Sequence, residues 1–227
     1  MNHKLKLGLW EAGCVIWICV AGALLHFAFE LSNFWKPLAL IAAVNESAWE
    51  HSKMYFWPGV LYALIQYTYT RNIANNYWLG KALALAVTPV IIFATYYSYM
   101  ALIDITGDKA SLPVMLGIMV FGVSFGQWVS FRILTSPPFK PALRRYALPA
   151  YAALIGMYSA FTFFPPKVFL FENFYCYQYT GDYGILPDYE RYRVFTRPGG
   201  GTPGGGVNYC EGVVISNNDI ESVAALR

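Results

Sequence analysis

Residues 26–51 read HFAFELSNFWKPLALIAAVNESAWEH and combine apolar runs with a concentration of ionisable side chains. Two of the three histidines of the chain, His26 and His51, lie here together with Glu30, Glu46 and Glu50. Such groups are costly to place in apolar surroundings unless they are paired or bind something. The stretch therefore predicts a polar site within a strongly hydrophobic protein.

The rest of the chain has the composition of a membrane protein. Of its 227 residues, 57% are hydrophobic and 13% are charged, and the mean hydropathy is +0.40. Soluble domains carry about 25% charged residues, roughly twice this content. The net charge is +3, and the sequence holds no cluster of basic residues with aromatic residues between them. We therefore expect no nucleic-acid partner. The expected partner is the lipid bilayer.

Five apolar runs approach or exceed the length that a membrane-spanning helix needs, which is about 20 residues. We therefore predict an all-α membrane protein, a bundle of about five transmembrane helices in residues 1–166. Residues 167–227 would form an extramembrane tail with a flexible Gly-rich linker at 199–206. The predicted spans are residues 8–30, 46–70, 77–103, 112–134 and 145–163.

The basic residues predict the orientation, because cytoplasmic loops carry an excess of Lys and Arg. The side of the N-terminus would hold eight of them: Lys4, Lys6, Arg71, Lys81, Arg132, Lys140, Arg144 and Arg145. The other side, before the tail, would hold Lys36, Lys53 and Lys109. We expect an inner (cytoplasmic) membrane protein with a cytoplasmic N-terminus and an outside tail. The first run also has the basic start of a signal peptide, but it continues past Ala21-Gly22-Ala23, which favours a retained helix.

This topology gathers the ionisable residues of the opening stretch at the outer face. Residues 31–45 join the first two runs through the apolar segment 38–44, which is too short to span. We interpret residues 31–45 as a short re-entrant or interfacial segment that covers the site. In the tail, the aromatic segment 169–194 is a candidate contact for membrane protein partners. Cys176 and Cys210 could form a disulfide if the tail faces an oxidising compartment.

Spacing within the opening stretch predicts a metal site, since residues four apart share one face of a helix. His26 pairs in this way with Glu30, and Glu46 with Glu50. Imidazole and carboxylate ligands suit Zn²⁺ or another divalent transition metal. A carboxylate that does not bind the metal could act as general base for a metal-bound water, so Glu46 and Glu50 are the candidate catalytic residues. The candidate metal ligands are His26, Glu30, Glu46, Glu50 and His51.

Each polar group also has a structural interpretation. Ser47-Ala48-Trp49-Glu50 fits a helix capping box, and Asn45 could be the cap instead. A cap does not account for the two histidines or for Glu30. Within the apolar runs, Glu11 either reaches the interface or pairs with a lysine. Three other polar residues of these runs either line a polar path or hydrogen-bond between helices: Gln66, Ser124 and Gln127.

Several segments resemble a known family. They are HFAFE at 26–30, AAVNESAWEHSKMYFWP at 42–58, FTFFPPKVFLFENF at 161–174 and TGDYG at 180–184. They resemble an uncharacterised prokaryotic family of multi-pass integral membrane proteins, the domain of unknown function numbered 6512, over about residues 8–185. The resemblance implies a multi-pass inner-membrane protein and carries no activity with it.

Two classes of function remain open on the sequence. The protein is either a metal-dependent membrane enzyme acting on a lipid or a small molecule, or a non-enzymatic protein. In the second class it would be a small-solute carrier or a structural or accessory subunit, and the His/Glu cluster would be a polar network that locks two helices together.

Overall fold

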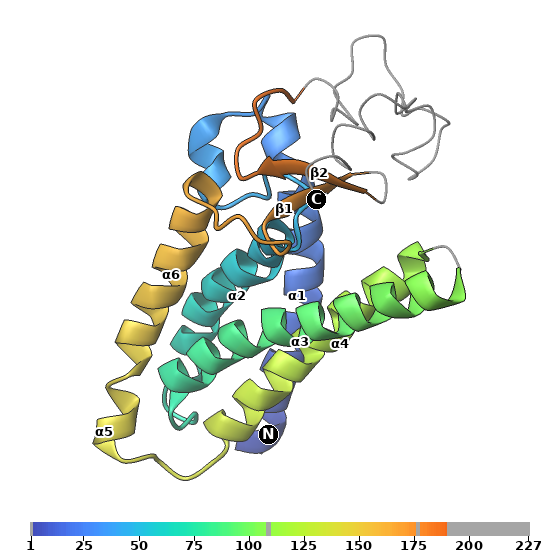
Figure 1. Ribbon diagram of the computed structural model, residues 1–227. Helices are drawn as coiled ribbons and strands as arrows, with labels where there is room; N and C mark the ends of the chain where they lie inside the picture. The colour runs from blue at the N-terminus through green and yellow to red at the C-terminus, as the bar shows by residue number, and fades with distance from the viewer. Residues whose placement is uncertain (1, 108–109, 176–177, 190–227) are drawn as a thin grey trace, which may run out of the picture. The chain divides into compact units, whose positions relative to one another are not determined.

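The computed structural model describes residues 2–107, 110–175 and 178–189, and within these ranges the fold is mostly helical (Figure 1). Five of its helices are long. The elements are α1 (His3–Leu31), the 3-10 helix η1 (Lys36–Leu40), α2 (Ala48–Thr70), α3 (Tyr77–Thr106), α4 (Leu112–Leu134), α5 (Pro141–Arg144), α6 (Ala147–Phe163), β1 (Glu172–Tyr175) and β2 (Gln178–Tyr183).

Three of the helices are long and apolar enough to cross a membrane. These are α1, α3 and α4, whose most apolar segments have mean hydropathies of 2.1, 1.7 and 1.7. Helices α2 and α6 coincide with the second and fifth apolar runs of the sequence. Among the described residues, neither of these two helices is both long enough and apolar enough to count as a candidate span. A bundle of five membrane spans therefore stays a prediction.

The chain divides into two compact units, and α1, α2 and α6 each contribute residues to both. The first unit comprises Met1–Leu24 and Ser52–Met157, and the second comprises Leu25–His51 and Tyr158–Arg227.

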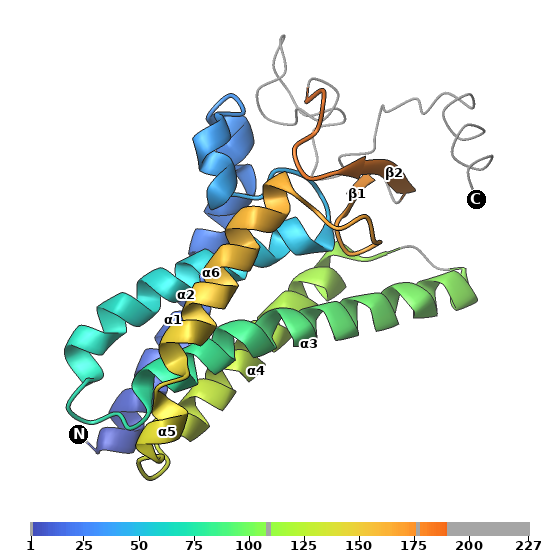
Figure 2. The ribbon, with the colours of Figure 1, turned by 60° about the vertical axis from the view of Figure 1, so that its left-hand side comes forward.

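Glycines allow α3 and α4 to pack closely in the first unit (Figure 2). A Cβ atom at Gly126 would collide with the side chain of Thr88, and one at Gly122 with the side chain of Ile92. The two glycines are four residues apart and so lie on one face of α4. Small residues at this spacing let helix backbones approach in a membrane, where packing rather than water exclusion holds helices together.

The second unit is built around aromatic side chains. Trp49, at the start of α2, stacks on Tyr158 of α6 with ring centroids 4.9 Å apart. It also contacts the rings of Phe161 and Phe171. Aromatic contacts of this kind add to the stability that burial of the rings provides.

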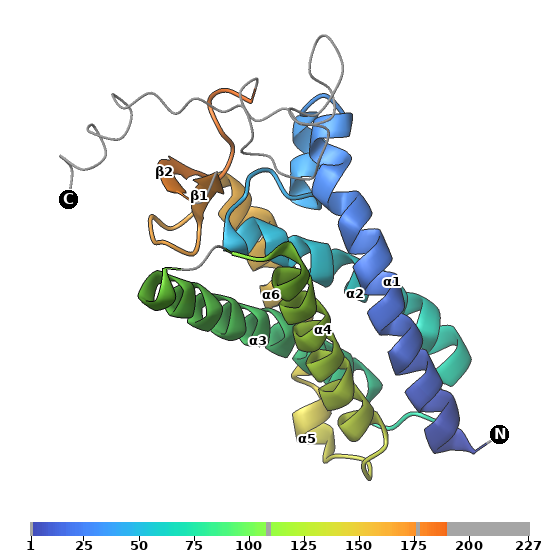
Figure 3. The same ribbon diagram turned by 90° about the vertical axis from the view of Figure 1, so that its right-hand side faces the viewer.

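A small sheet in the second unit was not predicted. Strands β1 and β2 form an antiparallel pair (Figure 3). Glu172 lies opposite Tyr183 and Phe174 opposite Tyr179, with an irregularity between these two pairs. The fold is thus mostly helical and not all-α. The Gly-rich linker and the cysteine pair Cys176 and Cys210 lie outside the described residues.

Candidate metal centre

The second unit brings three of the predicted ligands together. His26 comes from α1, Glu46 from the segment before α2, and His51 from the first turns of α2. One ligand atom from each residue lies within 4.8 Å of the other two. Glu46 is the shared partner: its Oε2 is 3.3 Å from Nε2 of His51, and its Oε1 is 4.0 Å from Nε2 of His26.

The orientation of the His51 ring is determined by the backbone. Nδ1 of His51 lies 2.9 Å from the carbonyl oxygen of Ser47. Because a carbonyl can only accept, Nδ1 carries the hydrogen and Nε2 is left to face Glu46. Nε2 then either carries a second proton or offers its lone pair to a cation. Metal-binding histidines in proteins are commonly held by a hydrogen bond of this kind at the other ring nitrogen.

The backbone of Glu46 is held by the hairpin. The N–H of Glu46 donates to Oδ1 of Asn173 at 2.9 Å, and the side chain of Asn173 is fully buried. Next to it, Asn45 donates from Nδ2 to the carbonyl of Gly184 at 2.7 Å and accepts from the N–H of Ser47 at 2.8 Å. The segment that carries Glu46 is thus tied to β1 and to the residue after β2.

The predicted capping box forms in one direction only. The N–H of Glu50 donates to Oγ of Ser47 at 3.2 Å, as a cap requires. The carboxylate of Glu50 does not reach back to the N–H of Ser47. It accepts from the N–H of Val44 at 3.1 Å and from the hydroxyl of Thr162 at 2.8 Å. Glu50 is 1% exposed, so this carboxylate joins α2 to the preceding loop and to α6 inside the second unit.

Two predicted ligands therefore lie outside the group. Among the described residues, neither Glu30 nor Glu50 belongs to the cluster of His26, Glu46 and His51. The geometry gives no support to Glu50 as ligand or base, because both of its oxygens are engaged in buried hydrogen bonds. Thr162 and Asn173, which support the site, were not predicted as functional residues. The signal that marks them is their place in FTFFPP and ENF, two of the segments that resemble the family.

Charge favours the ionised form of Glu46. Partial burial alone would raise the pKa of its carboxyl, but the imidazoles of His26 and His51 and the hydrogen bond from His51 outweigh that effect and lower the pKa to about 2. Burial likewise lowers the pKa of His51, whereas the charge and hydrogen bond of Glu46 raise it, and the net direction is upward. In the absence of a metal, both directions favour an ion pair between Glu46 and His51.

The three side chains are accessible to solvent in different degrees. The side chain of Glu46 is 43% exposed, that of His51 29% and that of His26 16%. Nδ1 of His26 is buried, and it has no hydrogen-bond partner in the part of the chain that the structure describes. An orphaned buried nitrogen beside two potential ligands indicates that the polar contacts of the cluster are incomplete.

The spacing of the ligand atoms is close to that of a metal site. Zinc binds nitrogen and carboxylate oxygen at about 2.0–2.2 Å, so two ligand atoms of a tetrahedral site lie about 3.3–3.6 Å apart. The distance of 3.3 Å between Glu46 and His51 fits, and that of 4.0 Å between Glu46 and His26 needs a small side-chain movement. Three protein ligands would leave a fourth position for water or substrate, as in catalytic zinc sites.

These features define a class: a mostly helical protein with helices long and apolar enough for a membrane and with a group of two histidines and one glutamate. Within that class, the sequence model of the family of unknown function DUF6512 matches residues 1–185, and the chain belongs to this family. This confirms the family resemblance of the sequence segments. No curated protein and no solved structure matches the chain.

Proposed function

We propose that this protein is an integral membrane protein that binds a divalent transition metal ion through His26, Glu46 and His51. The observation that carries the proposal is the convergence of their three ligand atoms within 4.8 Å. The backbone-held ring of His51 supports it, because a ring that is fixed in advance loses little freedom when it binds an ion. The partly exposed carboxylate of Glu46 leaves a route for the ion to enter.

The proposed chemistry is metal-assisted attack on a lipid or a small molecule. An ion with an open position polarises a carbonyl or phosphoryl oxygen and makes bound water nucleophilic near neutral pH. Glu46 has two oxygens, one nearer His26 and one nearer His51. One of them would bind the ion, and the other would be placed to act as general base. Glu46 thus takes the catalytic role that the sequence assigned jointly to Glu46 and Glu50.

The proposed setting is a cell membrane with the N-terminus on the cytoplasmic side. The support is the apolar character of α1, α3 and α4 and the distribution of basic residues along the chain. Two residues in that count lie within helices and are buried, namely Lys53 in α2 and Lys81 in α3. Leaving them out of the count does not reverse the bias. Residues 31–45 and the tail would then lie on the outer side with the metal centre.

The second candidate function is a structural or accessory one, or that of a small-solute carrier. The ion pair between Glu46 and His51 favours it, as does the set of hydrogen bonds that ties the segment of Glu46 to the hairpin. In a protein of this kind the cluster would hold the elements together without a metal. The exposed side chains of Phe164, Val168 and Phe169, which are 81%, 48% and 58% exposed, would then be candidates for contact with a membrane protein partner.

Elemental analysis of detergent-purified protein distinguishes the two functions. The full-length chain is purified, incubated with Zn²⁺, Mn²⁺ or Fe²⁺ and freed of unbound ion. We expect about one ion per chain, and loss of that ion in His51→Ala and in His26→Ala. The variant His3→Ala is the matched control, because His3 is exposed at the start of α1 and lies outside the cluster. A wild-type protein that holds none of these ions would overturn the metal proposal and leave the structural one.

A further inference from the structure

A groove lies between α1 and α4 in the first unit, and we call it the α1–α4 groove. Gly8, Ala12 and Val15 of α1 form part of one wall, and Trp128 and Phe131 of α4 form part of the other. The volume of the groove is about 270 Å³, and most of the surface that lines it is apolar. Concave surfaces of this composition are typical binding sites for apolar groups.

One end of the groove is formed by the start of α1 and the end of α4. A Cβ atom at Gly8 would lie 3.7 Å from the ring of Phe131. One turn nearer to the end, Leu7 of α1 and Leu134 of α4 belong to the same core cluster. The first turn of α1 therefore lies next to the last turn of α4, and basic residues of both turns are brought together.

Lys4 and Arg132 lie at this end. Lys4 precedes the wall residue Gly8 by four positions, and Arg132 follows Trp128 by four, so each shares a helix face with a wall residue. Both basic residues are exposed, and neither forms an ion pair within the part of the chain that the structure describes. The guanidinium carbon of Arg132 lies 5.8 Å from the ring centre of Trp128, which is 52% exposed. Each helix thus places a positive charge at one end of an apolar groove.

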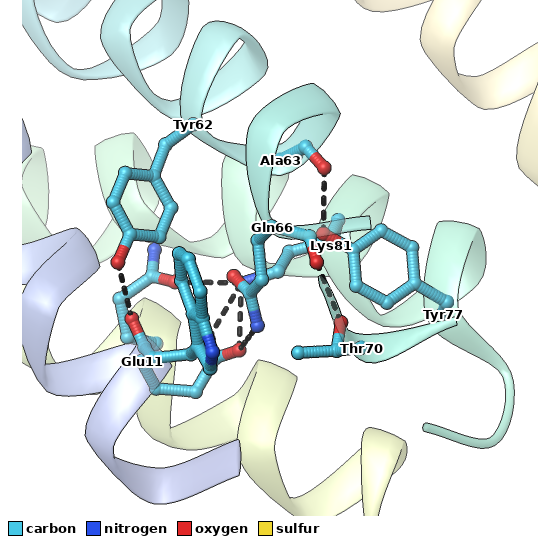
Figure 4. A network of polar contacts seen from close by, with 9 residues as sticks. Glu11, Tyr62, Ala63, Gln66, Thr70, Tyr77 and Lys81 are labelled. Atoms are coloured by element: carbon cyan, nitrogen blue, oxygen red, sulfur yellow. Dashed lines mark hydrogen bonds and ion pairs between the residues drawn. The ribbon is translucent and has the colours of Figure 1, made fainter. Parts of the chain in front are cut away.

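The acidic residue in the walls, Glu11, is already neutralised by a partner. Nζ of Lys81 lies 2.7 Å from both carboxylate oxygens of Glu11, and Gln66 donates to Oε1 of Glu11 at 2.7 Å (Figure 4). Lys81 also donates to Oε1 of the wall residue Gln127 at 3.3 Å. The pairing confirms one of the two interpretations of Glu11 that the sequence left open. It directs the carboxylate toward α2 and α3, so the charge at the end of the groove stays positive.

We propose that the α1–α4 groove binds an anionic phospholipid. One acyl chain lies in the groove against Ala12 and Val15, and the phosphate accepts hydrogen bonds from Lys4 and Arg132. A guanidinium can hold two phosphate oxygens at once, and the ammonium adds a second positive charge. Trp128 stands beside the headgroup, where tryptophan is common at membrane interfaces. The inference rests on the membrane setting proposed above and is independent of the metal centre.

The combination of an apolar groove and a basic end selects this class of ligand. A soluble anion would use the charges and leave the groove empty, and a neutral lipid would fill the groove and leave the charges without a partner. Basic residues beside a groove between membrane helices are a common way of holding anionic headgroups. Only a molecule with both a negative headgroup and a long apolar chain uses both parts of the site.

A lipid titration followed by native mass spectrometry tests the charged end of the site. The full-length protein in detergent is titrated with phosphatidylglycerol, which is anionic, and with phosphatidylcholine, which has no net charge. We expect the wild type to bind phosphatidylglycerol more tightly. Lys4→Gln and Arg132→Gln should each weaken that binding by about fivefold, the usual effect of one basic residue at an anionic membrane surface. Arg132→Lys keeps the charge and should bind more tightly than Arg132→Gln.

Arg71→Gln is the matched control for the loss of one positive charge. Arg71 is exposed and lies between α2 and α3, outside the two helices that form the groove. It belongs to the same end of the unit, because the N–H of Asn75 in the same connection donates to the carbonyl of Leu134 at 2.9 Å. The control should bind phosphatidylglycerol as the wild type does. Equal losses in Arg71→Gln and Arg132→Gln would overturn the site, since they would show attraction by the general surface charge.

A larger side chain in the groove tests the place of the acyl chain. Ala12 is an exposed wall residue, so Ala12→Phe fills the groove without a change of charge. We expect it to lose most of its phosphatidylglycerol binding, whereas Ala12→Ser, which stays small, should keep it. Unchanged binding in Ala12→Phe, or a wild type without preference for phosphatidylglycerol, would overturn the proposal. A protein that stays dispersed without detergent and binds neither lipid would overturn the membrane setting itself.

Discussion

Glu46 and His51 face each other at 3.3 Å between Oε2 and Nε2, although five positions separate them in the chain. Residues five apart lie on different faces of a helix. They meet here because α2 begins at Ala48, so that Glu46 lies in the preceding loop and can turn toward the ring. The pairing of Glu46 with Glu50 by helical spacing does not form for the same reason.

The first test of the proposed metal ligands replaces carboxylates by amides. Glu46→Gln removes the charge with little change of shape, and we expect it to weaken metal binding by about tenfold or more, because neutral amides are poor ligands for transition metals. The matched variant Glu30→Gln changes a carboxylate that is outside the group of three. Isothermal titration of both variants with Zn²⁺ gives the affinities. Equal losses in the two would return Glu30 to the ligand set.

Asn173 should position Glu46 without touching the ion. Its buried side chain accepts the N–H of Glu46, so Asn173→Ala frees the segment that carries the ligand. Loss of a supporting hydrogen bond of this kind typically weakens metal binding by about 10–100-fold. Asn173→Asp keeps an acceptor oxygen at the same place and should bind the ion more tightly than Asn173→Ala. Comparable affinities for the alanine variant and the wild type would remove Asn173 from the site.

Thr162 should matter for stability and not for metal binding. Its hydroxyl donates to the buried carboxylate of Glu50, and Thr162→Val leaves that oxygen without this donor. We expect a loss of about 1–3 kcal/mol in the free energy of unfolding. The control Thr68→Val removes an exposed hydroxyl on α2 that bonds only a carbonyl of its own helix, and should change stability by less than about 0.5 kcal/mol.

Denaturant unfolding in detergent measures both threonine variants, and elemental analysis of the same samples reports the metal content. A stable Thr162→Val protein that has lost its metal would show that Glu50 acts on the site after all.

Close packing of α3 on α4 predicts a sharp difference between two glycines of one helix. A Cβ at Gly126 meets the side chain of Thr88 and lies 3.0 Å from the carbonyl oxygen of Ala84, whereas nothing lies within 4 Å of a Cβ at Gly117. Gly126→Ala should cost about 1–3 kcal/mol through overpacking. Gly117→Ala should be neutral or stabilising by up to about 1 kcal/mol, because alanine favours a helix. Thermal unfolding of the two variants in one detergent decides the point.

Hydrophobicity and local spacing account for the features that the sequence predicted correctly. The long apolar runs predict α1, α3 and α4, since a helix is the simplest way to satisfy a backbone inside a membrane. Ser47 and Glu50 are three residues apart, and this spacing predicts the start of α2. The structure confirms the hydrogen bond from the N–H of Glu50 to Oγ of Ser47. The segments with NESAWEH and FTFFPP predicted the family.

Tertiary structure decided which of the ionisable residues meet. Glu11 and Lys81 are 70 residues apart, Thr162 and Glu50 are 112 apart, and Asn173 and Glu46 are 127 apart. Helical periodicity relates residues within a few turns, and it carries no information on which distant segment will face a given side chain. The sequence by itself therefore determined that His26, Glu46 and His51 belong to one polar region. Only the packing of the chain separated them from Glu30 and Glu50, and only that packing brought Lys81 to Glu11.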